Sequence, residues 1–244
     1  MRDLHTHTLY SDGKNTPEEM ILAAIEKGFD EIGISDHAYT FFDESYCMKK
    51  EAIDRYLAEI AALKEKYRGR ISVKCGVEQD LFSTESTERF DYAIGSLHYL
   101  KRGEEYRPLD CAKEDFVAIA KDWYGGDYYA LCEEYFSLVS AYADRSDVEI
   151  IGHFDLVTKY NGGNALFDER DPRYLAAATK AADILLRAQK TFEINTGAMA
   201  RGYRSAPYPA APILRRIREQ GGATILSSDA HTVQTIGYAF DRHF

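Results

Sequence analysis

The stretch Met1-Arg-Asp-Leu-His5-Thr-His7-Thr-Leu-Tyr-Ser-Asp12-Gly13 opens the chain and decides the fold prediction. His5 and His7 are two residues apart, and side chains at that spacing on an extended strand point to the same face. Neutral imidazole is the commonest protein ligand for zinc-like metals, so two on one face can begin a metal site. Asp12 follows in a polar Ser-Asp-Gly turn, where its carboxylate can swing back over the strand end. A His-x-His pair alone is a weak signal, and the positions of the other histidines give it meaning.

Beyond this stretch, strand-like and helix-like segments alternate along the chain. We expect strands over residues 4–8, 31–35, 71–77, 92–97, 148–152, 191–194 and 224–227. We expect helices from Pro17 to about Gly28, over residues 49–68, from Asp127 to about 142, and over residues 172–190 and 210–219, with loop and some helix over 101–123. Thr16, Pro17 and Glu19 mark the first of these helices, because they form a capping box with proline at the first helical position. The alternation predicts parallel strands with crossover helices, and seven units favour a closed barrel over an open doubly wound sheet.

The composition indicates a single domain over residues 1–244, since a closed α/β barrel commonly takes about this length. Four scattered cysteines (Cys47, Cys75, Cys111 and Cys132) are expected to be reduced thiols. We find neither a signal peptide nor an apolar run long enough for a membrane span, and expect a cytoplasmic protein without a membrane partner. The formal net charge of −10 argues against nucleic acid as a partner, because such proteins need a basic face.

Six of the seven histidines fall at or just after the end of an expected strand. They are His5, His7, His37, His98, His153 and His231, and three carboxylates, Asp12, Glu78 and Asp229, occupy equivalent places. Only His243 lies outside this pattern, and we interpret it as an ordinary surface residue. The carboxyl ends of parallel strands meet on one face of a barrel, so these nine side chains are expected to lie together. Nine ligands exceed the needs of one ion and, with one bridging carboxylate, fit two or three ions, as is typical of phosphoester hydrolysis.

The motifs that carry these residues occur in a characteristic order. They are His5-Thr-His7, Ser11-Asp12-Gly13, Ser35-Asp36-His37, Gly76-Val-Glu78, Gly95-Ser-Leu-His98, Gly152-His153 and Ser228-Asp229-Ala-His231. As a set they resemble the polymerase and histidinol phosphatase (PHP) superfamily over nearly the whole chain. The resemblance implies a distorted seven-stranded (β/α) TIM-like barrel with three divalent metal ions, zinc, manganese or iron, at the carboxyl ends of the strands.

The resemblance also implies how the ligands are shared. One metal would be held by His5, His7, Glu78 and Asp229; a second by Glu78 as bridging ligand with His98 and His153; the third by Asp12, His37 and His231. Some relatives have histidine in place of Asp12, and the carboxylate is the harder ligand. Relatives usually continue with a further helix after the seventh strand, and we expect residues 236–244 to form a shortened version of it.

Within the superfamily, Glu193-Ile-Asn195-Thr-Gly197, Arg201-Gly-Tyr-Arg204 and Pro207-Tyr-Pro209 look like the histidinol-phosphate phosphatase branch. This implies an enzyme of histidine biosynthesis whose small-molecule substrate is the phosphomonoester L-histidinol phosphate, hydrolysed to L-histidinol and phosphate. Arg201 or Arg204 could bind phosphate oxygens, which guanidinium groups favour. The substrate's ammonium and imidazole need acidic or aromatic partners, and Asp43, Glu44 and the aromatic segment 123–129 are candidates, although such aromatics more often pack helices.

The expected mechanism is hydrolysis by a metal-bound hydroxide that attacks phosphorus in line. Asp229 or His231 could pass a proton to the leaving alkoxide, as groups near the metals can act as general acids. Two alternatives stay open: another phosphoesterase of the same superfamily, acting on nucleotides, oligonucleotides or phosphotyrosine, and a non-catalytic metal-binding module. The sequence leaves the oligomeric state open.

Overall fold

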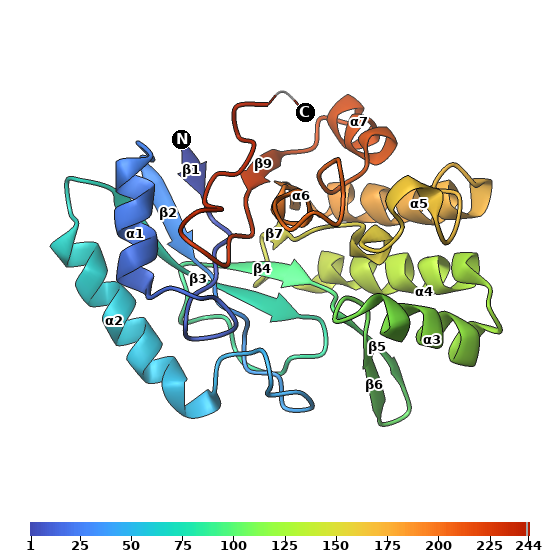
Figure 1. Cartoon of the computed structure of the whole chain (residues 1–244), viewed down its shortest axis with the longest axis horizontal. Coiled ribbons are helices and arrows are strands. Elements are labelled where there is room, and N and C mark those ends of the chain that lie inside the picture. Colours follow the sequence, from blue (N-terminus) through green and yellow to red (C-terminus); the bar gives the residue numbers. More distant parts are fainter. Residues whose placement is uncertain (243) are drawn as a thin grey trace.

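The computed structural model describes residues 1–242 and 244 and has the expected sheet of seven parallel strands in the order β1-β2-β3-β4-β7-β8-β9 (Figure 1). The strands are β1 (Arg2–Asp3), β2 (Glu31–Ile34), β3 (Ser72–Asp80), β4 (Tyr92–Ser96), β7 (Ile150–Ile151), β8 (Thr191–Asn195) and β9 (Thr224–Ser227). The first and last strands meet through a parallel bridge between Thr6 and Ala230, in which the N–H of His7 donates to the Ala230 carbonyl at 2.8 Å. The sheet is therefore a nearly closed, distorted TIM-like barrel, as predicted.

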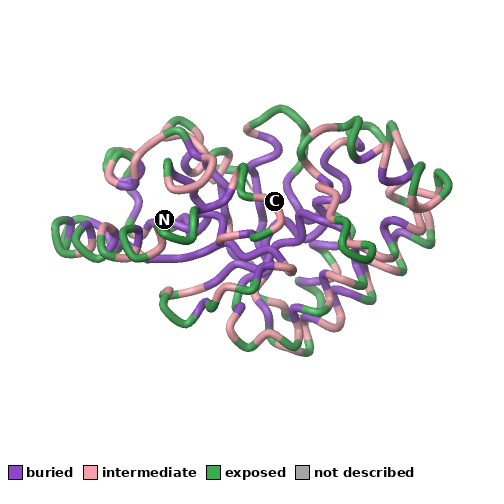
Figure 2. Tube along the Cα trace, turned by 90° about the horizontal axis from the view of Figure 1, so that it is seen from below, coloured by how far each residue is buried: buried purple, intermediate pink, exposed green. Residues whose placement is uncertain are grey.

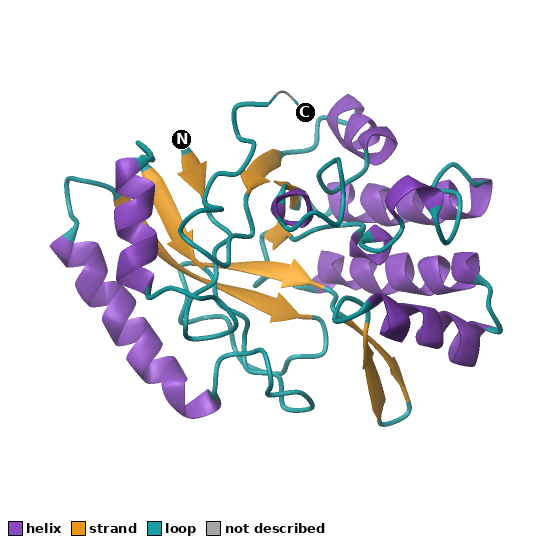
Figure 3. Cartoon of the chain, viewed as in Figure 1, coloured by secondary structure: helices purple, strands orange, loops and turns teal. Residues whose placement is uncertain are grey.

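Helices flank the barrel on two sides (Figure 3). They are α1 (Pro17–Glu26), α2 (Ile53–Lys66), α3 (Lys113–Tyr124), α4 (Tyr128–Ser140), α5 (Pro172–Arg187), α6 (Gly197–Ala200) and α7 (Ala211–Glu219), with 3₁₀ turns at Lys50–Ala52, Ala141–Asp144, Leu156–Thr158 and Gly162–Asn164. The capping box of Thr16 and Glu19 is present, and the Asp127 side chain accepts from the N–H groups of Tyr129 and Ala130 at the start of α4. Both helix starts were predicted from these cap residues.

The apolar core lies mainly between the barrel and its helices, and Figure 2 shows buried segments in the middle of the molecule and exposed ones at its rim. A smaller apolar cluster, separate from this core, consists of Leu4, Ile94, Ile150 and Ile225, and Tyr92 packs against it. A Cβ at Gly76 would come within 2.2 Å of the Tyr92 ring. The close approach of this ring therefore requires glycine on the neighbouring strand.

Three expectations about local structure are wrong. The first strand covers Arg2–Asp3 rather than 4–8, because its ladder with β2 ends at Asp3 and Thr6 makes only an isolated bridge to Ala230. The segment 101–123, expected to be loop with some helix, contains the helix α3 but also most of an unexpected hairpin, β5 (Tyr99–Arg102) and β6 (Glu105–Pro108), which turns at Gly103 with a φ of +59°. Residues 236–242 form turns instead of a helix, since Gly237 and Ala239 have φ values of +65° and +59°.

His243, expected at the surface, lies outside the described residues. The four cysteines are free, as predicted. None of the helices in the described residues combines the length and the apolar character that a membrane crossing needs.

Candidate metal centre

Glu78 is the point on which the predicted ligands converge. It lies on β3, its side chain is 1% exposed, and five histidines from four other parts of the chain surround it. The distances from a Glu78 carboxylate oxygen to the nearest ring nitrogen are 3.3 Å for His5, 3.5 Å for His7, 2.9 Å for His37, 3.5 Å for His98 and 3.1 Å for His153. One buried carboxylate among five imidazoles is an arrangement suited to bridging metal ions.

The other predicted ligands complete the cluster. Oδ1 of Asp229 is 3.4 Å from Nε2 of His7, and Nε2 of His231 is 3.1 Å from Oδ2 of Asp12. Three overlapping groups can each hold an ion: His7, Asp12, His37 and His231; His5, His7 and Asp229; and His37, Glu78 and His98. The structure thus brings all nine side chains together, and His153 joins them through Glu78.

The buried polar atoms of the cluster fit metal ions. Nε2 of His5, both ring nitrogens of His7 and Oε2 of Glu78 are buried without a hydrogen-bond partner in the described part of the chain. Orphaned buried atoms of this kind are costly, because nothing replaces their hydration. A set of imidazole nitrogens and carboxylate oxygens is the donor set that zinc and other transition metals take.

The imidazoles and carboxylates of the cluster shift one another's ionisation. Burial alone would lower the pKa of His5, but the carboxylates of Glu193, Glu78 and Asp229 raise it well above its ordinary value. Burial would raise the pKa of Glu78, and the imidazoles of His5, His37, His98 and His153 hold it well below its ordinary value. Burial, together with His231 and His37, lowers the pKa of His7 to about 3. Glu78 is therefore a carboxylate, and His7 is neutral and free to donate a lone pair.

Two further carboxylates orient ligand residues. Oε1 of Glu193, on β8, lies 2.7 Å from Nδ1 of His5, and its Oε2 accepts from the His153 N–H at 3.1 Å. Asp80, at the end of β3, accepts from the His98 N–H at 2.8 Å. Of these three hydrogen bonds, the one between Glu193 and Nδ1 of His5 fixes ring orientation and tautomer. The other two are made to the backbone N–H groups of His153 and His98 and hold the main chain that carries those rings. Neither residue was predicted as a site residue: Glu193 begins one of the quoted motifs but was given no role, and nothing in the sequence marks Asp80.

The cluster opens into a cavity of about 270 Å³. All the predicted ligands except His5 and His7 line this cavity. The other lining residues are Ser45, Tyr46, Tyr99, Asp110, Cys111, Leu156, Lys159, Arg201 and Tyr203. Arg201 follows α6, and its guanidinium donates to Oδ2 of Asp229 at 2.8 Å and to Nδ1 of His231 at 3.1 Å. A cation with several donors therefore stands directly beside the predicted ligands, where an anionic group of a substrate would enter.

Arg204 lies elsewhere. Its side chain is 8% exposed, it donates to the Thr158 carbonyl at 2.9 Å and approaches Glu169 at 3.4 Å, and it does not line the cavity. The structure therefore places only Arg201 of the two predicted phosphate ligands at the site. Two arginines three residues apart on an irregular loop need not face the same way, and the sequence holds no period that tells them apart.

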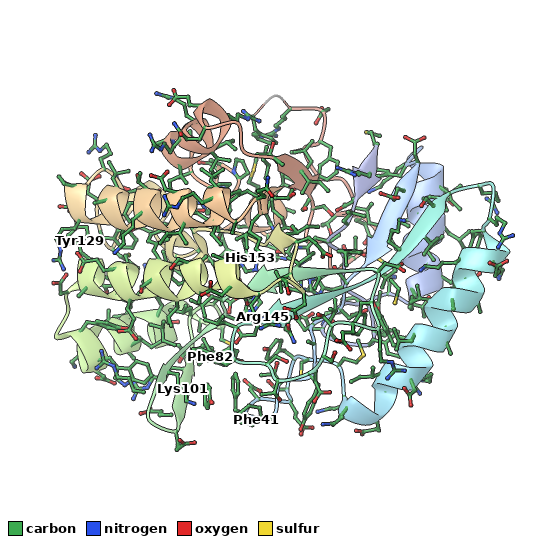
Figure 4. The ribbon with its side chains drawn as sticks, turned by 180° about the vertical axis from the view of Figure 1, so that it is seen from behind. Phe41, Phe82, Lys101, Tyr129, Arg145 and His153 are labelled. Carbon is green, nitrogen blue, oxygen red and sulfur yellow. The ribbon has the colours of Figure 1, made fainter. Side chains whose placement is uncertain are left out.

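The residues suggested as partners for the substrate's ammonium and imidazole also lie outside the cavity. Asp43 accepts from Tyr99 Oη at 2.7 Å and Glu44 pairs with Lys49, and neither lines the cavity. Trp123 carries the guanidinium groups of Arg102 and Arg107 over its ring at 5.1 and 5.0 Å. Figure 4 shows Tyr129 at the outer end of the helices and His153 near the middle of the molecule. The aromatic side chains of segment 123–129 pack against the hydrophobic core between the helices, in agreement with the alternative prediction that they are helix-packing residues.

Asp110, Lys159, Tyr46, Tyr99 and Tyr203 line the cavity and were missed. Tyr99 begins the β5–β6 hairpin, just before the segment 101–123 that was expected to be loop with some helix, and Asp110 follows the hairpin within that segment. Lys159 follows His153 by six residues, and this spacing alone gives no reason to single it out.

A parallel α/β barrel with a histidine and carboxylate cluster at the carboxyl ends of its strands defines a class of metal-binding barrels. The chain belongs to the PHP domain family, whose model matches residues 3–197. A probable histidinol-phosphatase of Deinococcus radiodurans is 31% identical, over 98% of this chain and 89% of its own. The histidinol-phosphatase of Bacillus subtilis is 26% identical, over 98% of this chain and 97% of its own. The crystal structure of a histidinol phosphate phosphatase from Lactococcus lactis, in complex with zinc, L-histidinol and phosphate, covers 95% of this chain and 86% of its own at 20% identity, with a TM-score of 0.72.

Proposed function

We propose that this protein hydrolyses L-histidinol phosphate to L-histidinol and phosphate, as a metal-dependent phosphomonoesterase of histidine biosynthesis. The observation that carries the proposal is the convergence of five histidines on Glu78, within 3.5 Å, beside a cavity that contains Arg201. The family and the relatives named histidinol-phosphatase support this substrate over other phosphoesters.

Three divalent ions fit the ligand set. One is assigned to His5, His7, Glu78 and Asp229, a second to Glu78, His98 and His153, and the third to Asp12, His37 and His231. Zinc is the first candidate, because the Lactococcus lactis enzyme was crystallised with it. Manganese and iron accept the same donors, and the hard carboxylate of Asp12 suits them as well.

Divalent ions bound here would polarise a phosphate ester and lower the pKa of a water molecule, which are the two needs of phosphomonoester hydrolysis at neutral pH. The residues of the chain do the remaining work. Arg201 keeps donors beyond those given to Asp229 and His231, and these can hold a non-bridging phosphate oxygen. Lys159 is a second cation in the cavity, with its side chain 11% exposed. Both cations favour the dianionic ester over a neutral one.

The leaving alkoxide needs a proton. Asp229 and His231 both line the cavity beside Arg201, and we keep them as the candidates for the general acid. The proposed partner is thus the small phosphomonoester alone, without nucleic acid or membrane.

The test is phosphate release from L-histidinol phosphate, compared with p-nitrophenyl phosphate, a mononucleotide and a phosphotyrosine peptide. Metal-analysed protein is assayed with and without a chelator. We expect chelator-sensitive hydrolysis with the highest kcat/KM for L-histidinol phosphate. A higher kcat/KM for the mononucleotide or the peptide would assign the protein to another phosphoesterase of the family. A metal-loaded protein inert toward all four esters would contradict catalysis altogether.

A further inference from the structure

Asp110 stands apart from the other carboxylates of the cavity. Within the described residues the cavity is lined by Asp12, Glu78, Asp110 and Asp229, and of these only Asp110 is outside the predicted ligand set. It follows the β5–β6 hairpin, and the N–H of its neighbour Leu109 donates to the carbonyl of the predicted ligand His98 at 2.7 Å. The backbone that carries Asp110 is thus tied directly to the cluster.

Two residues of the loop after β7 hold Asp110 in place. Nζ of Lys159 donates to the Asp110 carbonyl at 2.7 Å and to its Oδ2 at 3.2 Å, and Oη of Tyr160 donates to the same carbonyl at 2.7 Å. The side chain of Asp110 is 25% exposed and that of Lys159 is 11% exposed. The carboxylate is therefore fixed before a substrate arrives, which lowers the entropic cost of binding.

The carboxylate keeps one free oxygen and its charge. No group in the described part of the chain hydrogen-bonds to Oδ1 of Asp110, whereas Oδ2 accepts from Lys159. The ammonium of Lys159, 3.2 Å from Oδ2, favours the ionised form of the Asp110 carboxyl. Asp110 is thus an anion that presents an acceptor to a cavity whose ligand cluster and Arg201 suit a phosphate group.

We propose that Asp110 is the specificity-determining residue that binds the protonated amine of the substrate, so that the cavity selects phosphomonoesters whose alcohol carries a cationic amine near the ester. This inference rests on the proposed function, because it assigns the amine of L-histidinol phosphate. The acidic residues suggested from sequence do not compete, since Asp43 and Glu44 are paired with Tyr99 and Lys49. Selection by a fixed carboxylate is effective, because an uncharged analogue cannot pair with the charged acceptor.

The test compares two esters on three proteins. The esters are L-histidinol phosphate and its analogue with hydrogen in place of the amine; the proteins are the wild type, Asp110→Asn and Asp115→Asn. Asp110→Asn keeps the shape and an acceptor for Lys159 but removes the charge. Asp115 is exposed at the start of α3, so its variant makes the same charge change outside the cavity.

We expect the wild type to prefer the amine-bearing ester and Asp110→Asn to reduce that preference at least about tenfold, mainly through KM. Asp115→Asn should keep the preference of the wild type, and Asp110→Glu should restore part of it. Metal content and thermal unfolding are measured on each variant, and Asp110→Ser replaces Asp110→Asn if the latter does not fold.

An unchanged preference in a folded, metal-loaded Asp110→Asn protein would overturn the role of Asp110 and leave the proposed function standing. A wild type that hydrolyses neither ester would overturn both. Equal losses on the two esters in Asp110→Asn would also contradict amine recognition, because they would indicate a general effect on the site.

Discussion

Oε1 of Glu193 lies 2.7 Å from Nδ1 of His5, and the same carboxylate accepts the N–H of His153 through its other oxygen. Glu193 is fully buried on β8 and connects two predicted ligands that are 148 residues apart in sequence (153 − 5). Because Nδ1 of His5 is engaged by a carboxylate, its Nε2 is directed toward Glu78 and Asp229, where a bound metal ion would take the place of the Nε2 proton.

Replacing Glu193 with Ala should therefore weaken metal binding about 10- to 100-fold, as is usual when the carboxylate behind a histidine ligand is lost. Glu193→Gln should weaken it less, since the amide oxygen can still accept from Nδ1–H of His5. Metal affinity is measured by titration against a competing chelator. Glu88→Ala, at an exposed position, is the matched control. Equal metal affinity in Glu193→Ala and the control would show that Glu193 has no positioning role.

We expect substitutions of the two arginines after α6 to have different effects, on catalysis for Arg201 and on stability for Arg204. Arg201→Lys should lower kcat/KM for a phosphomonoester about 100-fold, because the bidentate donor beside Asp229 and His231 is lost. Arg204→Lys should instead lower the free energy of unfolding by roughly 2 kcal/mol, since it disturbs buried hydrogen bonds to Thr158 and Glu169. Kinetics and chemical denaturation on both variants check this, and reversed effects would contradict the placement of these side chains.

The raised pKa of Asp155 leads us to expect that the free energy of unfolding depends on pH. The Asp155 carboxyl is fully buried, and burial raises its pKa from the ordinary value of 3.8 to about 6, although Arg204 opposes the shift. A carboxyl that ionises less readily when folded contributes stability below its unfolded pKa, and that contribution is lost as the pH rises through the folded pKa. The stability of the wild type relative to Asp155→Asn should thus fall by about 2–3 kcal/mol between pH 4 and pH 7.5.

This difference is measured by urea denaturation of both proteins across that pH range. Glu169, Arg204, Tyr174 and Tyr208 also face Asp155 and are present in both proteins, so their titration largely cancels. A relative stability that rises with pH would mean that Asp155 is ionised at lower pH in the folded protein than in the unfolded one.

Much of the site could be predicted because its rules are local. The pairing of His5 and His7 was predicted from the two-residue period of a strand, and both rings do lie beside Glu78, although β1 itself ends at Asp3. The other histidines were predicted from the gathering of strand ends on one face of a barrel. The capping box of Thr16 and Glu19 is likewise a short-range pattern that needs no tertiary information.

The remainder depends on contacts that no local pattern encodes. Tyr99 to Pro108 form a hairpin of two short, charged strands, and only its turn at Gly103 marks it in sequence. Asp110 reaches the cavity because Leu109 pairs with His98 and Lys159 comes from another loop. The direction of Arg204 is set by the buried partners Thr158 and Glu169, which lie far away in sequence.

The most direct test of the metal-dependent mechanism is a joint measurement of metal content and turnover on Glu78→Gln. Glu78 is the carboxylate that five histidines surround, and a neutral amide cannot bridge cations as a carboxylate does. We predict that the variant loses at least one equivalent of metal and most of its turnover of L-histidinol phosphate. Full activity with unchanged metal content would contradict the bridging role of Glu78.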